Sequence, residues 1–473
     1  MAMENINEKT IKQQEAEMQA RQNKMGHMPV GKLIFTMSVP MVISMLVQAL
    51  YNVVDSYFVA KYSNEALNAV SLAYPIQMLM IAVGVGTSVG MNSYISRKLG
   101  AGETEKANKG ASNGIFLLVL SALAFAALGF FITPFFRLFS DKQNLIGLGV
   151  DYLSICMWFS LGVFVQLGCE RILQSMGKTG LSMVTQLVGA VVNIILDPIM
   201  IFNLGMGIKG AAYATVIGQW IGMGVALLLV LGKEHEVKLS FKKFKPCKET
   251  IVDIYRVGLP SIIMQAITSV MITGMNMILA RVLADVGGES ATSIVGVYFK
   301  VQSMIFMPLF GVTNASMSIL AYNFGARNRL RLMKAWKITL ITAVCIMAVG
   351  TALFQLFPKE IIGMFDHDGT ITKGGVAAFR IISLSFILAA ASITNSVTFG
   401  ALGKGVNSMI MSILRQLGVL LPAALLLALA FHKVEAVWWS FFIAEFAALI
   451  YGFIMLSRLY KKEIASLPDG AAV

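Results

Sequence analysis

Residues Leu340–Phe354 read LITAVCIMAVGTALF, a run without a single charged side chain. Mostly apolar runs of the same kind occur at Phe116–Leu128, Val188–Ile201 and Leu420–Phe431. Their flanks extend each one towards the ~20 residues that a helix needs to cross a ~30 Å hydrocarbon core. Because lipid admits only helices or closed barrels, and because these runs do not alternate with polar residues, they indicate helices. The sequence therefore predicts an all-α polytopic membrane protein.

The composition of the whole chain supports a membrane protein. Of its 473 residues, 57% are hydrophobic and 13% are charged, and the mean hydropathy is +0.73; a soluble domain carries about 25% charged residues. We expect two six-helix lobes at 33–232 and 252–457, a linker at 233–251, and tails at 1–32 and 458–473. The twelve predicted spans are 33–60, 67–95, 111–136, 149–174, 179–203, 210–232, 252–281, 292–320, 336–357, 374–400, 407–431 and 436–457.

The distribution of positive charge predicts the orientation of these spans. The net charge is +13, and most Lys and Arg residues fall in segments on the same side of the membrane as the N-terminus. By the positive-inside rule both termini lie in the cytoplasm of a multi-pass cell-membrane protein. The same rule accounts for the basic run Lys238–Lys248, which would otherwise suggest a nucleic-acid partner.

The two halves of the chain resemble each other. Landmarks recur in the same order about 220 to 226 residues later: Ser38–Val39–Pro40 as Gly258–Leu259–Pro260, Gly86 as Gly311, Leu99–Gly100–Ala101 as Phe324–Gly325–Ala326, Gly177–Lys178 as Gly403–Lys404, and Pro198 as Pro422. Since each half has an even number of spans, the halves share one orientation. This pattern predicts two pseudo-symmetric six-helix bundles with a central cleft, an arrangement that transporters use.

Two acids lie deep in predicted spans of the first half. An acid at bilayer depth costs about 2.5–3.5 kcal/mol on insertion scales, so it is a functional candidate. Asp55 lies in span 1; Asp197 lies in span 5, one helical turn after Asn193. Their aligned positions in the second half are Met275 and Leu421, so the fold itself does not demand acids there. Burial disfavours the charged carboxyl, which suits a proton-coupled site, while the same oxygen ligands also suit Na⁺.

Other membrane-embedded candidates leave more than one interpretation open. Glu170 in span 4 either attracts organic cations or forms a self-neutralised pair with Arg171. Glu445 in span 12 is either functional or a structural hydrogen-bond acceptor. Met275 belongs to a methionine-rich set that either lines a permissive cavity or packs in the interior. Neither a metal-ligand cluster nor a catalytic constellation is apparent, so we expect no enzyme, no catalytic or metal site and no cofactor besides a coupling ion.

The chain resembles the MATE (multidrug and toxic compound extrusion) transporters over about residues 30–460. The resemblance rests on Pro40 and on four segments: Gln48–Asp55 (QALYNVVD), Leu173–Thr179 (LQSMGKT), Asn193–Pro198 (NIILDP) and Gly210–Thr215 (GAAYAT). The pair Glu170–Arg171 resembles a bacterial multidrug subgroup of this family.

This resemblance implies efflux of amphipathic, often cationic drugs by alternating access, coupled to H⁺ or Na⁺. It implies a cation- or proton-binding network, which here is Asp55, Asn193, Asp197 and Thr215, and a bending point at Pro40. Candidate residues of the substrate cleft are Tyr51, Glu170 and Met275. One branch of the family has an acidic Na⁺ site on spans 7 and 10, but here span 7 offers Met275 and Asn276, and span 10 has no acid.

Two other functions are alternatives to an antiporter. The first is a flippase for lipid-linked or other large polar substrates on a related scaffold, which predicts several cationic residues in the cleft. The second is a membrane enzyme or structural protein, which lacks a supporting constellation. Drug-like small molecules and the lipid bilayer are the expected partners, and no obligate protein partner is inferred.

Overall fold

The computed structural model describes residues 24–139, 142–232, 235–239, 244–366 and 371–469, and within these ranges the chain is helical with no strand. The predicted N-terminal tail falls largely outside the described residues. The helices up to the middle of the chain are α2 (Lys24–His27), α3 (Val30–Tyr62), α4 (Asn64–Gly100), α5 (Thr104–Leu128), α6 (Ile132–Phe139), α7 (Gln143–Trp158), α8 (Leu161–Ser175), α9 (Thr179–Pro198), α10 (Ile208–Val230) and α11 (Lys248–Val282). Those that follow are α12 (Gly288–Gly325), α13 (Arg329–Leu356), α14 (Pro358–Gly363), α15 (Thr372–Ser383), α16 (Phe386–Ala401), α17 (Gly405–Ile413), α18 (Leu420–Phe431) and α19 (Val434–Leu459).

These helices confirm the predicted class of a polytopic α-helical membrane protein. Ten spans in the described residues are long and apolar enough to cross a bilayer, and two bent helix pairs bring the number to 12. Short π-helical turns extend or interrupt three of the spans, namely η2 (Ile199–Asn203), η4 (Leu414–Gly418) and η5 (Tyr460–Ile464).

The fourth and tenth spans are broken, which the continuous hydropathy of residues 149–174 and 374–400 did not predict. Helices α7 and α8 meet at 47°, and α15 and α16 meet at 48°. A serine lies in each break: Ser160 donates a hydrogen bond to the Ala122 carbonyl, and Ser385 donates one to the Ile382 carbonyl. Nearly the same bend therefore recurs at the corresponding place in the two halves of the sequence.

The chain divides into two compact units whose boundaries fall inside helices. One unit contains residues 24–28 and Val39–Ile262; the other contains Pro29–Ser38 and the chain from Ile263 onward. Helices α3 and α11 each contribute to both units, and the division falls within two residues of Pro40 and of Pro260. The predicted lobes, by contrast, placed the division at the linker 233–251.

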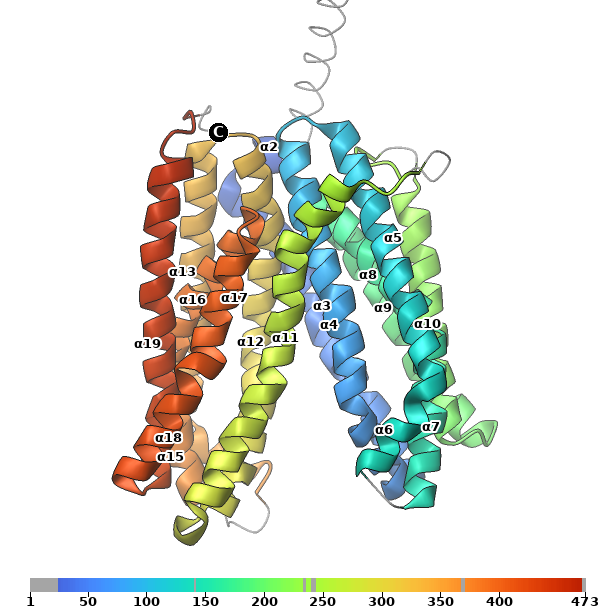
Figure 1. Ribbon diagram of the computed structural model, residues 1–473, viewed down its shortest axis with the longest axis vertical. Helices are drawn as coiled ribbons and strands as arrows, with labels where there is room; N and C mark the ends of the chain where they lie inside the picture. The colour runs from blue at the N-terminus through green and yellow to red at the C-terminus, as the bar shows by residue number, and fades with distance from the viewer. Residues whose placement is uncertain (1–23, 140–141, 233–234, 240–243, 367–370, 470–473) are drawn as a thin grey trace, which may run out of the picture. The chain divides into compact units, whose positions relative to one another are not determined.

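In the first unit, α4 packs on α5, α7 and α8, and α10 packs on α7, α8 and α9 (Figure 1). The described part of the linker docks on α5: the Lys238 amide donates to Asn108 Oδ1 (2.7 Å) and the Cys247 amide donates to Asn113 Oδ1 (3.0 Å). The described part of the basic segment is thus held against its own unit through backbone amides.

In the second unit, α13, α16 and α19 run side by side, with α12 against α13 and α16 (Figure 1). Its core is rich in aromatic rings. Phe354 and Phe379 stack with centroids 4.5 Å apart, and Tyr298 meets both of them edge-on. Such aromatic packing gives this unit an apolar centre.

Glycines allow α4 and α11 to approach within the first unit. A Cβ at Gly90 would overlap the Ile254 carbonyl oxygen and lie 2.8 Å from the Gly258 nitrogen. We expect Gly90→Ala to lower the free energy of unfolding by about 1–3 kcal/mol, because backbone cannot move aside as a side chain can. Thermal unfolding of the purified protein in detergent measures this loss. Gly224→Ala on α10 is the matched control, since no atom lies within 4 Å of its Cβ; an equal loss there would contradict the explanation.

Candidate functional site

The two deep acids of the first half meet in the first unit. Asp55 lies on α3, and Asp197 lies in the last turn of α9, where its side chain is 0% exposed. Their carboxyl groups are within hydrogen-bonding reach of each other. Two acids that lie 142 positions apart in the sequence are thus brought together by α3 and α9.

Asn193 and Thr215, which the family resemblance places in the same network, lie beside this pair. Asn193 Nδ2 lies 3.5 Å from Asp197 Oδ1 and 3.3 Å from Thr215 Oγ1 on α10. The close packing of α9 on α10 requires glycine, because a Cβ at Gly218 would lie 2.7 Å from the Gly189 carbonyl oxygen. The glycines thus bring Thr215 to the helix that carries Asn193 and Asp197.

Two tyrosines approach the acids from other helices. Tyr51, one turn before Asp55, lies close to Thr215 and to both carboxyl groups. Tyr152 on α7 also lies near Asp55, and it accepts a hydrogen bond of 3.3 Å from Gln77 on α4. Sequence reasoning missed Tyr152 and Gln77, because an uncharged polar residue in a span carries no signal by itself.

The acid pair lacks a positively charged neighbour. Among the described residues, neither Asp55 nor Asp197 forms an ion pair with Lys, Arg or His. Three buried oxygens there accept no hydrogen bond from an amide or hydroxyl group: Asp55 Oδ1, Asp197 Oδ2 and Asn193 Oδ1. Two carboxylates in contact cannot both stay charged in a low-dielectric interior, so this arrangement needs a proton or another cation.

The helix that carries Asp197 changes its geometry directly after it. Helix α9 ends at Pro198 and continues as the π-helical turn Ile199–Asn203. Proline removes a backbone donor and clashes with the preceding turn, which accounts for the change. π-helical turns are frequent at functional sites, so this turn is consistent with a functional role for the acid beside it.

Glu170 on α8 forms a separate buried cluster. Its carboxylate accepts hydrogen bonds from Gln166 Nε2 (3.0 Å), Thr185 Oγ1 (3.0 Å) and Gln186 Nε2 (2.7 Å), and its side chain is 2% exposed. Arg171 Nη1 donates to Gln174 Oε1 at 3.0 Å. Neutral donors therefore satisfy Glu170. Gln166 precedes Glu170 by four residues, so the sequence could have indicated this donor. The donors on α9, Thr185 and Gln186, could not be located from the sequence.

A cavity of about 130 Å³ links the two groups. Its walls include residues of the acid network and residues of the Glu170 cluster, together with further glutamines on α3 and α10. The polar side chains that line it are Gln48, Tyr51, Gln166, Glu170, Gln186, Asn193, Thr215 and Gln219. The predicted cleft residues Tyr51 and Glu170 thus share one polar cavity inside the first unit.

The structure places the other predicted residues elsewhere. Pro40 lies inside α3, and its carbonyl accepts a hydrogen bond of 2.9 Å from Ser44 Oγ. Met275 is 0% exposed in the hydrophobic core of the second unit, where Leu421 packs against that core. The positions aligned with Asp55 and Asp197 are therefore filled by apolar packing in the second unit.

Comparison with known proteins gives the affiliation of the chain. The model of the MatE family matches residues 40–199 and residues 260–426. The chain belongs to the MatE family. The affiliation expected from the QALYNVVD and NIILDP segments is thus confirmed, and the matched segments of this MatE chain lie one in each half of the predicted repeat.

Relatives of this MatE chain cover nearly its whole length. The Multidrug export protein MepA of Staphylococcus saprophyticus is 26% identical over 436 residues, covering 91% of this chain and 95% of the relative. MepA of Staphylococcus haemolyticus is 27% identical over 438 residues, with the same coverage of 91% and 95%. Among solved structures, an outward-facing conformation of a multidrug resistance MATE transporter of the MOP superfamily superposes with a TM-score of 0.86 at 27% identity, over 93% of this chain and 98% of the other.

Proposed function

We propose that the protein is a secondary antiporter that exports amphipathic cationic compounds in exchange for H⁺ or Na⁺. The observation that carries this proposal is the contact between Asp55 and Asp197, which lacks a basic partner among the described residues. Such a pair is stable when a proton lies between its oxygens, or when a cation binds both. Cation binding and release there supply the coupling step.

The shared cavity supplies the exchange. Asn193 and Thr215 of the acid network line the same space as Glu170, so a cation bound at the acid pair acts on a substrate in the cavity through these shared wall residues. At 100 mV each inward monovalent cation supplies ~2.3 kcal/mol, which supports roughly a fifty-fold substrate gradient. This coupling drives the substrate outward as the cation enters.

The cavity also favours positively charged substrates. Its only acidic or basic side chain among the described residues is that of Glu170, and Tyr51 adds an aromatic ring. A flippase for anionic lipid-linked substrates would instead need cationic groups in this position. The relatives named multidrug export protein support drug-like molecules as the substrate class.

We place the protein in the cell membrane with both termini in the cytoplasm. The excess of Lys and Arg on the N-terminal side of the spans supports this orientation. The partners are then small drug-like molecules and the surrounding lipid.

Transport in proteoliposomes with separately imposed ion gradients tests the proposal. We expect a pH gradient alone to drive drug transport, because a hydrogen bond between two carboxyl groups requires one of them to be protonated. Transport driven only by a Na⁺ gradient would assign the coupling to Na⁺. Drug movement that follows neither gradient would contradict antiport.

A further inference from the structure

A groove of about 270 Å³ lies in the second unit. It is formed by the beginning of α13, the end of α16, and the last turns of α19 with η5. Its apolar walls are provided by Leu332, Met333, Trp336, Leu402, Phe453 and Leu456. Ser457 and Lys461 complete the wall on the α19 side.

The groove lies where the surface of α19 changes from apolar to polar. Exposed apolar side chains recur every three or four residues on one face of this span and so form a lipid-facing stripe: Trp439, Ile443, Phe446, Ile450 and Ile454. The stripe ends at Ile454, and the next exposed side chains of the helix are Ser457, Arg458 and Lys461. This change marks the level at which hydrocarbon gives way to lipid headgroups.

The basic residues near the groove differ in their pairing. Lys404 pairs with Glu463 at 2.6 Å, whereas Arg458, Lys461 and Lys462 form no ion pair with any described residue. Of these three unpaired cations, Lys461 lines the groove and Lys462 does not. An unneutralised ammonium group therefore lies beside an apolar groove at headgroup level.

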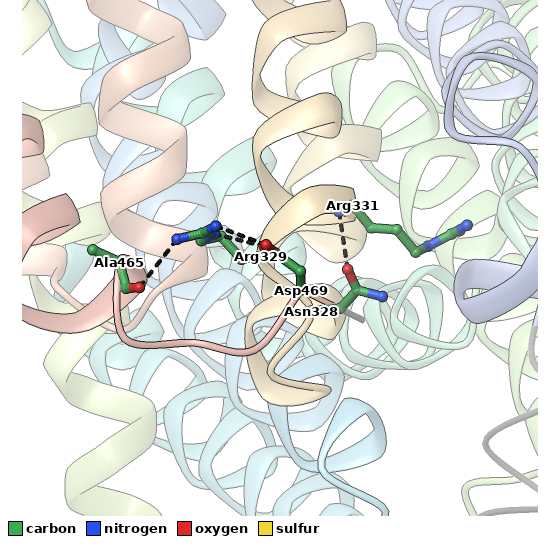
Figure 2. A network of polar contacts seen from close by, with 5 residues as sticks. All are labelled: Asn328, Arg329, Arg331, Ala465 and Asp469. Atoms are coloured by element: carbon green, nitrogen blue, oxygen red, sulfur yellow. Dashed lines mark hydrogen bonds and ion pairs between the residues drawn. The ribbon is translucent and has the colours of Figure 1, made fainter. Parts of the chain in front are cut away.

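The residues from Ala465 to Asp469 fold back and hold the groove in shape. The Arg329 guanidinium donates two parallel hydrogen bonds, of 2.7 and 2.8 Å, to the Asp469 carboxylate (Figure 2). It donates a third, of 3.2 Å, to the Ala465 carbonyl. With the ion pair of Lys404 and Glu463, these contacts tie η5 and the residues after it to α13 and to the start of α17. The groove is therefore preformed, which lowers the entropy cost of filling it.

We propose that this groove binds an anionic phospholipid. One acyl chain lies along Trp336, Phe453 and Leu456, and the headgroup phosphate meets Lys461 and the Ser457 hydroxyl. Acyl chains are the apolar ligands that a membrane supplies at this depth, and the unpaired cation selects an anionic headgroup over a zwitterionic one. This inference is independent of the proposed transport mechanism.

Trp336 serves as a reporter built into the groove. Its ring is fixed by a hydrogen bond of 3.2 Å from Nε1 to Asn395 Oδ1, whereas Trp439 lies on the lipid-facing stripe, 43% exposed. The full-length protein is reconstituted in phosphatidylcholine vesicles that contain a minor fraction of phosphatidylglycerol, with brominated acyl chains on one lipid at a time. The quenching of Trp336 is obtained as the difference in quenching between the wild type and Trp336→Phe. The quenching of Trp439 is obtained in the same way from Trp439→Phe.

We expect brominated phosphatidylglycerol to quench Trp336 about fivefold more effectively per mole than brominated phosphatidylcholine, the ratio that one cation near an anionic lipid provides. Trp439 should be quenched equally by both. Lys461→Gln should remove the preference at Trp336, and the matched variant Lys462→Gln should keep it. The proposal would be overturned if both brominated lipids quenched Trp336 of the wild type equally, or if the preference for phosphatidylglycerol survived Lys461→Gln. It would also be overturned if soluble glycerol 3-phosphate removed that preference.

Discussion

Asp197→Asn is expected to abolish drug efflux while leaving the protein folded and in the membrane. Asparagine matches the size of aspartate and keeps a hydrogen-bond partner for Asn193, but it can neither bind a proton nor balance a cation. With the coupling ion lost, the roughly fifty-fold gradient that one ion supports at 100 mV disappears. Accumulation of a fluorescent cationic dye in cells measures the effect, and size-exclusion chromatography of the purified variant checks folding.

Asp55→Asn should give the same loss, because the two carboxyl groups act as one pair. Asp151→Asn is the matched control: this acid lies on α7 in the same unit, but it is 42% exposed and pairs with Lys209 at 3.3 Å. Efflux at the wild-type rate from folded Asp197→Asn or Asp55→Asn would remove the acid pair from the coupling step.

Arg415→Met is expected to produce the largest loss of stability. Arg415 lies in the π-helical turn Leu414–Gly418, and its Nε contacts Glu445 Oε1 on α19 at 2.5 Å. Glu445 is 7% exposed, so removing its partner leaves a buried, uncompensated charge. Breaking such a pair costs about 3–5 kcal/mol, which thermal unfolding of the purified protein reveals as a lower Tm.

The double variant Arg415→Met with Glu445→Met distinguishes a charge effect from a packing effect. Removing both charges should recover most of the loss, since a well-packed apolar pair can replace a buried ion pair without a net cost. Arg458→Met is a surface control without an ion-pair partner among the described residues, and it should leave Tm unchanged. If the double variant is as unstable as Arg415→Met, the charge explanation is wrong.

Hydropathy was sufficient to predict the helical spans, whereas the grouping of Asp55 with Asp197 in one network was expected only from the resemblance to the MATE family. An acid in a span is costly, so its position alone marks it, and two spans of equal direction place two such acids at one depth. The partners of Glu170 were not predictable. Gln186 comes from another helix, and the sequence does not encode which faces of α8 and α9 meet.

The same limit applies to the second half. Glu445 was visible as a charge in a span, but its partner Arg415 comes from another helix, in the π-helical turn Leu414–Gly418, and the sequence does not encode which faces of these helices meet. The breaks at Ser160 and Ser385 were also missed, because hydropathy measures apolarity and not direction.

These breaks have a consequence for biosynthesis. Helices α7 and α8 contain 16 and 15 residues, each fewer than the ~20 residues that cross a bilayer. Neither arm can serve as a stop-transfer segment by itself, so the insertion machinery must accept both arms together before the following loop changes sides. The same joint insertion is required in the second half, where α15 and α16 contain 12 and 16 residues. In each half of the nascent chain, both arms of one bent span must therefore be synthesised before the topology of the later spans is set.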